Sequence, residues 1–230
     1  ISYLENDSMN IEMQISLDSF LEILKKNNKS ISSQFFDFDE NGTKELIINI
    51  FSDISEYYHS ILLFNYKDKN NFCFVKKFDN GTIIDYKNNI FIQPLLVFDS
   101  FYFCDSCYFS SNIINNKNIK YISPKIKYVF KDNQLYYKDK DKKLNKKIIN
   151  NLNSLSEMDY KILNKEFDEG IRRLYAENIL SYYYNSFDLN ESRNLFYKSY
   201  NFSDRHIVWK HIVVELIQEY SILKSGNEII

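Results

Sequence analysis

The segment from Asp37 to Glu45 has residue types and a spacing that could do chemistry. Side chains that carry oxygen occupy alternate positions, and they are Asp37, Asp39, Asn41, Thr43 and Glu45. Alternation places them on the inside of a short loop, Thr43 contributing its carbonyl, and Gly42 allows a sharp turn. Hard cations such as Ca²⁺ bind oxygen ligands of this kind. The segment therefore predicts a calcium loop that leads into an apolar strand.

An EF-hand and a plain polar turn are the other interpretations of this loop. An EF-hand is excluded because its twelfth position would be Ile48, where that motif requires a bidentate glutamate. A plain polar turn is the remaining alternative, with Asp and Asn present for their turn propensity alone. Calcium takes about six to eight oxygens, so water or a distant side chain would have to complete the shell.

The pattern Asp37-x-Asp39-x-Asn41-Gly42-x-x-Glu45-Leu resembles the calcium loop of FG-GAP/VCBS-type β repeats of exported bacterial proteins. The resemblance covers about residues 36–50, in a single copy, so a propeller is not implied. It implies a structural ion in a loop that joins two strands, with Glu45 beginning the second. It also implies a periplasmic or extracellular protein, with a signal peptide removed upstream of Ile1 or a lipid anchor there.

The cysteines offer a second constellation. Cys104 and Cys107 form a C-x-x-C unit, and Cys73 stands apart from it. A disulfide between Cys104 and Cys107 is favoured, as in oxidising compartments. A redox centre, a zinc site and two plain thiols are the alternatives.

The histidines point less clearly to a site. His211 and Glu215 stand four residues apart, so they share a helix face and could bind a metal or act as an acid–base pair. A helix face with a satisfied histidine is the favoured interpretation. No nucleophile elbow, Walker loop, dinucleotide fingerprint or His-Glu-x-x-His helix occurs, which favours a non-enzymatic protein.

Charge and hydropathy limit the partners. Lys and Arg number 29 and Asp and Glu 31, so no strong field attracts nucleic acid or an acidic membrane. No apolar run of the length of a membrane span occurs. Another protein is therefore the expected partner.

The periodicity of apolar residues predicts an α+β fold. We expect an N-terminal helix at 15–26, and strands at 45–52, 61–66, 72–78, 82–86, 125–131 and 134–138, mainly antiparallel. The charged run 138–147 is a linker or an exposed helix start. A helix is expected from Ser154 on, with a capped start near Ser156. A second helix is expected at 190–200, and a third from a Ser203 cap to about 223. Residues 1–140 would form a sheet domain and 150–230 a helical segment packed on it or forming a small bundle.

The leading hypothesis is an exported, non-enzymatic protein that binds another protein, for example as an immunity protein or inhibitor, and carries a structural calcium loop. The alternatives are a hydrolase-like enzyme that uses His211 and Glu215 or the acidic loop, and a cytoplasmic adaptor without an ion.

Overall fold

The computed structural model describes residues 30–51, 59–68, 71–79, 81–95, 119–138, 140–157 and 170–218. It confirms the α+β class, with two antiparallel sheets and with helices in the C-terminal half. The predicted helix at 15–26 and the pair Cys104 and Cys107 lie outside the described residues. The chain divides into two compact units, Ile1–Gln93 with Lys127–Lys138 and Ser225–Ile230, and Pro94–Ile126 with Asp139–Lys224.

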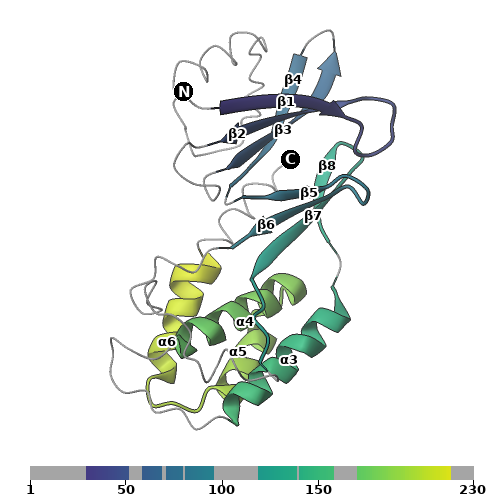
Figure 1. Cartoon of the computed structure of the whole chain (residues 1–230). Helices are drawn as coiled ribbons and strands as arrows, with labels where there is room; N and C mark the ends of the chain where they lie inside the picture. The colour runs from purple at the N-terminus through teal and green to yellow at the C-terminus, as the bar shows by residue number, and fades with distance from the viewer. Residues whose placement is uncertain are drawn as a thin grey trace. The chain divides into compact units, whose positions relative to one another are not determined.

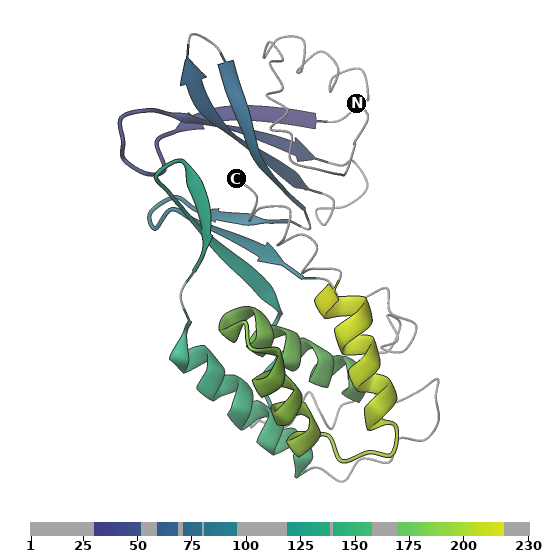
Figure 2. The same cartoon turned by 180° about the vertical axis from the view of Figure 1, so that it is seen from behind.

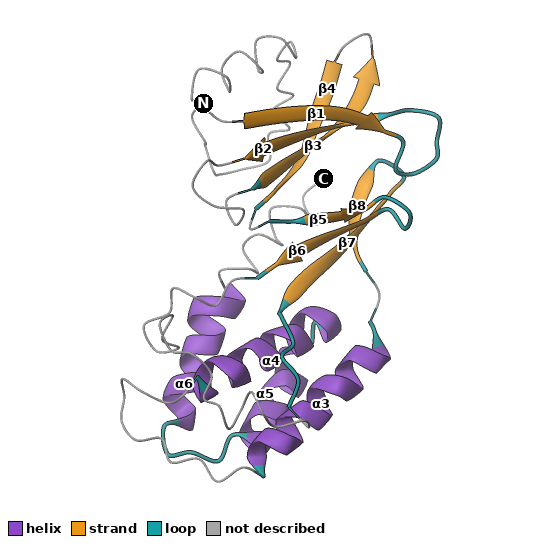
Figure 3. Ribbon diagram, viewed as in Figure 1, coloured by secondary structure: helices purple, strands orange, loops and turns teal. Residues whose placement is uncertain are grey.

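The first unit contains two four-stranded sheets (Figures 1 and 3). One sheet has the order β1 (Ser30–Phe36), β2 (Glu45–Phe51), β3 (Ser60–Asp68) and β4 (Asn71–Phe78). The other has the order β5 (Ile83–Asp85), β6 (Ile90–Pro94), β7 (Lys125–Lys131) and β8 (Gln134–Tyr137). The predicted strands are present, with ends that differ by up to two residues.

Strand β1 was not predicted from the sequence, and its position in the sheet explains why. It is an edge strand that pairs with β2 alone among the described strands, in the register Ser30↔Phe51 to Phe36↔Glu45. Five of its seven residues are exposed, so they show no alternation of apolar and polar residues. Backbone pairing to β2, not burial of its side chains, accounts for this strand.

The β7–β8 hairpin has a two-residue turn. Asp132 and Asn133 both have positive φ, at 51° and 62°, between the paired residues Lys131 and Gln134. This geometry matches the right-handed twist of the flanking strands, and Asp and Asn tolerate it better than most residues.

An aromatic core joins the two sheets of this unit. Phe38 lies in the loop between β1 and β2, yet its side chain is fully buried. Its ring centroid lies 4.8 Å from Phe36, 4.9 Å from Phe91 of β6 and 6.0 Å from Phe130 of β7. Phe91 in turn stacks on Phe78 of β4 at 4.7 Å. The loop is therefore anchored by its own side chain in the core.

The second unit contains the helices α3 (Lys142–Ser156), α4 (Ile171–Ser186), α5 (Leu189–Ser199) and α6 (Arg205–His211), and α6 continues as a π-helical segment at Ile212–Ile217. Helix α4 is central, since 12 of its residues are buried. The predicted helix at 190–200 is confirmed by α5. None of the helices in the described ranges combines the length and the apolar character needed to cross a bilayer.

The charged run holds a helix start, one of its two predicted alternatives, but the helix caps predicted near Ser156 and at Ser203 were wrong. The carboxylate of Asp141 accepts the backbone N–H groups of Lys143 and Leu144, so α3 begins inside the charged run, and Ser156 is its last residue. Asp204 precedes α6 in place of Ser203, but its carboxylate binds Arg172 at 2.8 Å and so makes no cap. The lysine-rich first turn of α3 has no apolar periodicity, so the sequence does not decide between a linker and a helix start. The ion pair between Asp204 and Arg172 depends on the tertiary fold, so its effect on the start of α6 could not be predicted.

Replacing Phe38 by alanine should destabilise the first unit strongly. Loss of a fully buried phenylalanine ring costs about 3–5 kcal/mol. The matched control is Phe35→Ala, because Phe35 on β1 is 50% exposed and its loss should cost about 1 kcal/mol or less. Urea unfolding followed by tyrosine fluorescence measures both. Equal losses for the two variants would contradict the anchoring role of Phe38.

Candidate metal centre

The candidate centre lies in the loop 37–44, which links two paired strands. The pair Phe36↔Glu45 is the last in the β1–β2 ladder, so it closes the loop at its base and makes Glu45 the first residue of β2. Because Phe38 points into the core, its neighbours Asp37 and Asp39 remain outside that core and are only partly buried.

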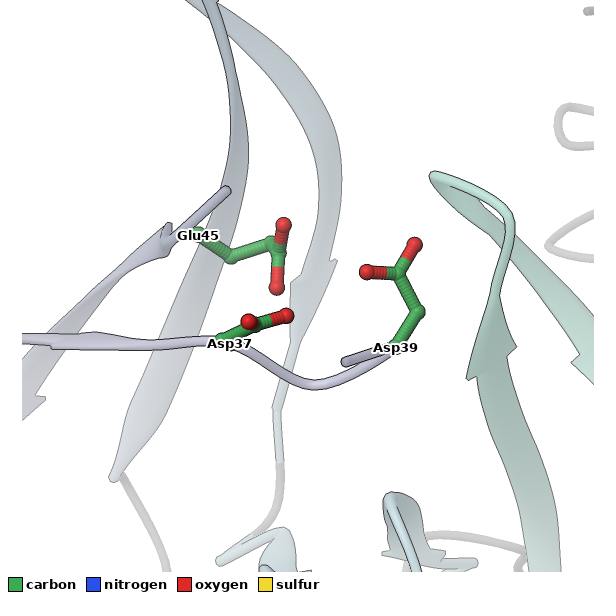
Figure 4. Close-up of side chains that lie close together, drawn as sticks. All are labelled: Asp37, Asp39 and Glu45. Atoms are coloured by element: carbon green, nitrogen blue, oxygen red, sulfur yellow. The ribbon is translucent and has the colours of Figure 1, made fainter. Parts of the chain in front are cut away.

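Three carboxylates converge in this loop. Asp37, Asp39 and Glu45 each offer an oxygen, and these oxygens lie within 4.8 Å of one another. Figure 4 shows the three carboxyl groups directed toward a common space. The structure thus brings together the three acidic residues of the predicted ligand set.

Glu45 has the most unusual surroundings of the three, because its side chain is fully buried. Its Oε2 accepts the N–H of Phe38 at 2.8 Å, whereas its Oε1 is buried with no hydrogen-bond partner. Burial raises the pKa of Glu45 to about 7; the charges of Asp39 and Asp37 add to this, and the Phe38 N–H opposes it. A buried oxygen without a partner costs about 1–3 kcal/mol, a cost that a hydrogen-bond donor or a cation would remove.

Backbone N–H groups hold the two aspartates. Asp37 accepts from Asn41 at 3.1 Å and from Gly42 at 3.0 Å, within the loop itself. Asp39 accepts from the N–H of Asn133, in the β7–β8 turn, at 2.8 Å. That turn lies beside the loop when the molecule is seen from either side (Figures 1 and 2). The second sheet therefore helps to orient the candidate ligands.

The two neutral members of the predicted set are engaged with each other. The Oδ1 of Asn41 accepts the N–H of Thr43 at 2.7 Å, so this amide oxygen is bound to the loop backbone. Gly42 has φ of +86°, and a Cβ added there would meet nothing within 4 Å. Glycine is therefore favoured at position 42 by its backbone conformation and not by lack of space.

The remaining predicted pair, His211 and Glu215, lies elsewhere, as do His59 and Cys73. Nδ1 of His211 is hydrogen-bonded to Oε1 of Glu215 on the next helical turn. His59 contacts Asn49 Oδ1 at 3.2 Å and stacks on Phe51, and its burial lowers its pKa. Cys73 is a half-buried free thiol on β4.

The carboxylate cluster can hold a proton or a divalent cation. Three carboxylates so close together repel one another when all are ionised, and either a proton on Glu45 or a bound cation relieves that repulsion. All the donors are hard oxygens, which suit Ca²⁺ and Mg²⁺ and not soft metals. Three clustered carboxylates suit Ca²⁺ better, because Mg²⁺ keeps most of its water ligands and usually binds only one or two carboxylates.

Comparison of the chain with protein-family models, with curated proteins and with solved structures found no match.

The buried carboxyl of Glu45 predicts a distinctive pH dependence in the ion-free protein. Its pKa is raised from 4.5 to about 7 in the folded state. The folded state therefore holds this proton more tightly than the unfolded state does. The tighter binding of this proton stabilises the folded state by up to about 3 kcal/mol. This stabilisation is fully present below pH 4.5 and is lost as pH rises through about 7.

Urea unfolding in EDTA at several pH values between 5 and 8 measures this dependence. Wild type should lose stability with rising pH relative to Glu45→Gln, which cannot ionise. Glu40→Gln, at an exposed position of the same loop, is the matched control and should follow wild type. A difference between wild type and Glu45→Gln that does not vary with pH would contradict the raised pKa.

Proposed function

We propose that this chain carries a structural calcium site at the β1–β2 loop. The observation that carries the proposal is the fully buried Glu45, whose Oε1 has no hydrogen-bond partner within a cluster of three carboxylates. A cation in that cluster would give this oxygen a partner and neutralise the mutual repulsion. Acidic residues on an open surface would not need such compensation, because water solvates them.

The proposed role of the ion is to fasten the first unit. The cluster joins the start of β2, through Glu45, to the β7–β8 turn, through the Asn133 N–H that holds Asp39. A cation bound to Asp39 and Glu45 would link these elements by a further interaction. The expected effect of calcium is therefore on the stability of this unit and not on a chemical step.

We propose weak calcium binding, which fits an exported protein. Asp37 and Asp39 already accept backbone hydrogen bonds, which a bound ion would have to rearrange or share. Calcium sites of extracellular modules bind with Kd on the order of 0.1–1 mM, far weaker than intracellular sensors. We propose that this site belongs to the weak class, which is filled where calcium is abundant, as it is outside the cell.

Calcium should raise the melting temperature of the EDTA-treated protein. For Kd on the order of 0.1 mM, about 2 mM Ca²⁺ stabilises by about 1.8 kcal/mol, or about 4–7 °C. Asp39→Asn should lose most of this shift because it removes one ligand charge. Glu40→Gln removes the same charge from an exposed position in the loop and should keep the shift. Mg²⁺ should stabilise less than Ca²⁺ does. An unchanged melting temperature in wild type would refute the proposal.

Binding of another protein is the second proposed role, and one surface feature favours it. Phe35 and Tyr66 are 50% and 40% exposed, and with Phe72 and the loop residues Gly42–Lys44 they line a hollow of about 380 Å³. Aromatic side chains are enriched in the cores of protein interfaces. Because residues 42–44 belong to the calcium loop, an ion in that loop would also shape this surface.

Substitution of Tyr66 by serine should abolish binding of a partner at this hollow. Tyr136→Ser is the control, since Tyr136 is 46% exposed on β8 and does not line the hollow. The test uses proteins from the extracellular fraction of the source organism, retained on the immobilised chain in millimolar calcium. A protein retained by wild type and Tyr136→Ser but lost by Tyr66→Ser supports the role. Equal retention by wild type, Tyr136→Ser and Tyr66→Ser contradicts the role.

A further inference from the structure

The second unit holds a polar cleft that the calcium site does not involve. Its volume is about 760 Å³, and it is lined by residues of the segment 120–125, by α3 and by Ser181 of α4. This volume falls within the range of about 300–1,000 Å³ that is usual for sites of small ligands. Figure 3 shows the segment before β7 as a loop that passes along the helices.

Positive charge dominates the lining. Lys120, Lys125 and Lys147 line the cleft, and no Asp or Glu is among the lining residues. All three lysines are exposed, and within the described part of the chain none of them has a carboxylate partner. The ammonium groups are therefore available to a ligand.

A buried amide holds one wall of the cleft in place. The side chain of Asn151 on α3 is 3% exposed. Its Oδ1 accepts the N–H of Lys120 at 2.8 Å, and its Nδ2 donates to the carbonyl oxygen of Lys120 at 2.9 Å. The same Nδ2 donates to Asn178 Oδ1 on α4 at 2.9 Å. A buried polar network with its partners in place is rigid, so Lys120 is positioned before any ligand binds.

A second contact holds Tyr121, the residue after Lys120, and involves the nearby carboxylate of Glu177. Tyr121 donates its hydroxyl to Glu177 Oε1 at 3.2 Å, and Arg173 Nε donates to the same oxygen at 2.9 Å. Glu177 is 2% exposed and forms an ion pair with Arg173. Its charge is therefore compensated by Arg173 and does not cancel the field of the lysines.

We propose that this cleft binds a small anionic sugar derivative, of the sugar phosphate or sugar carboxylate class. Lysine binds phosphate and carboxylate groups as a compact positive charge. The lining also offers amides and hydroxyls, from Asn150, Asn153, Ser123 and Ser154, which match the hydroxyls of a sugar. The cleft is larger than a bare inorganic anion needs, and its three lysines favour an anionic ligand over a neutral one.

The test titrates the full chain with glucose 6-phosphate, glucuronate and glucose, followed by calorimetry and by ¹⁵N amide shifts. At least one anionic sugar should bind saturably with Kd below about 10 mM, glucose should not, and binding should weaken as salt is added. The shifts should fall on 120–125 and on α3. Binding of neither anion in this range, or equal binding of glucose, would overturn the proposal.

Neighbouring lysines on α3 provide the matched variants. Lys147→Gln removes a lining charge and should raise Kd by about tenfold, the effect of losing one charged hydrogen bond. Lys146→Gln removes the adjacent exposed charge, which does not line the cleft, and should leave Kd unchanged. Both substitutions are at exposed positions, so circular dichroism should show wild-type folding. An equal loss of affinity for the two variants would overturn the proposal.

Discussion

The hydrogen bond from the Phe38 N–H to the carboxyl of Glu45 is the constraint around which the first unit is arranged. It ties the loop to the first residue of β2 and holds a carboxyl group inside the protein. The same loop residue inserts its ring among Phe36, Phe91 and Phe130. Backbone and side chain of Phe38 therefore act together, since the buried ring fixes where its N–H points and the N–H fixes Glu45.

Burying Glu45 has an electrostatic cost that the loop offsets only in part. One oxygen is satisfied by Phe38, and the other has no hydrogen-bond partner. Asp37 and Asp39 approach the same space because backbone N–H groups from the loop and from the β7–β8 turn hold them there. A protein that needed only a turn at this place could use uncharged side chains. The concentration of negative charge is what a cation site requires.

The acidic ligands and most strands could be predicted from the local spacing of residues in the sequence. Alternation from Asp37 to Glu45 placed three carboxylates together, and the Asp132-Asn133 turn marked the late hairpin, because both depend on neighbours in the sequence. Asn133 as a partner of Asp39 could not be predicted, since the two residues are 94 positions apart and only the tertiary fold joins them. Phe38 as an anchor was missed for the same reason: its burial depends on β6 and β7. The sequence predicts either a linker or a helix start at the charged run, because the first turn of α3 is rich in lysine and has no apolar periodicity.

Calorimetric titration of calcium into the EDTA-treated protein at pH 6.5, in two buffers of different ionisation enthalpy, tests the central claim most directly. Because burial raises the pKa of Glu45 to about 7, a large share of the molecules should carry its proton at this pH and release it when calcium binds. We predict one calcium ion per chain, with release of part of a proton in wild type and none in Glu45→Gln. The absence of binding heat, or binding that releases the same number of protons from both proteins, would contradict the account.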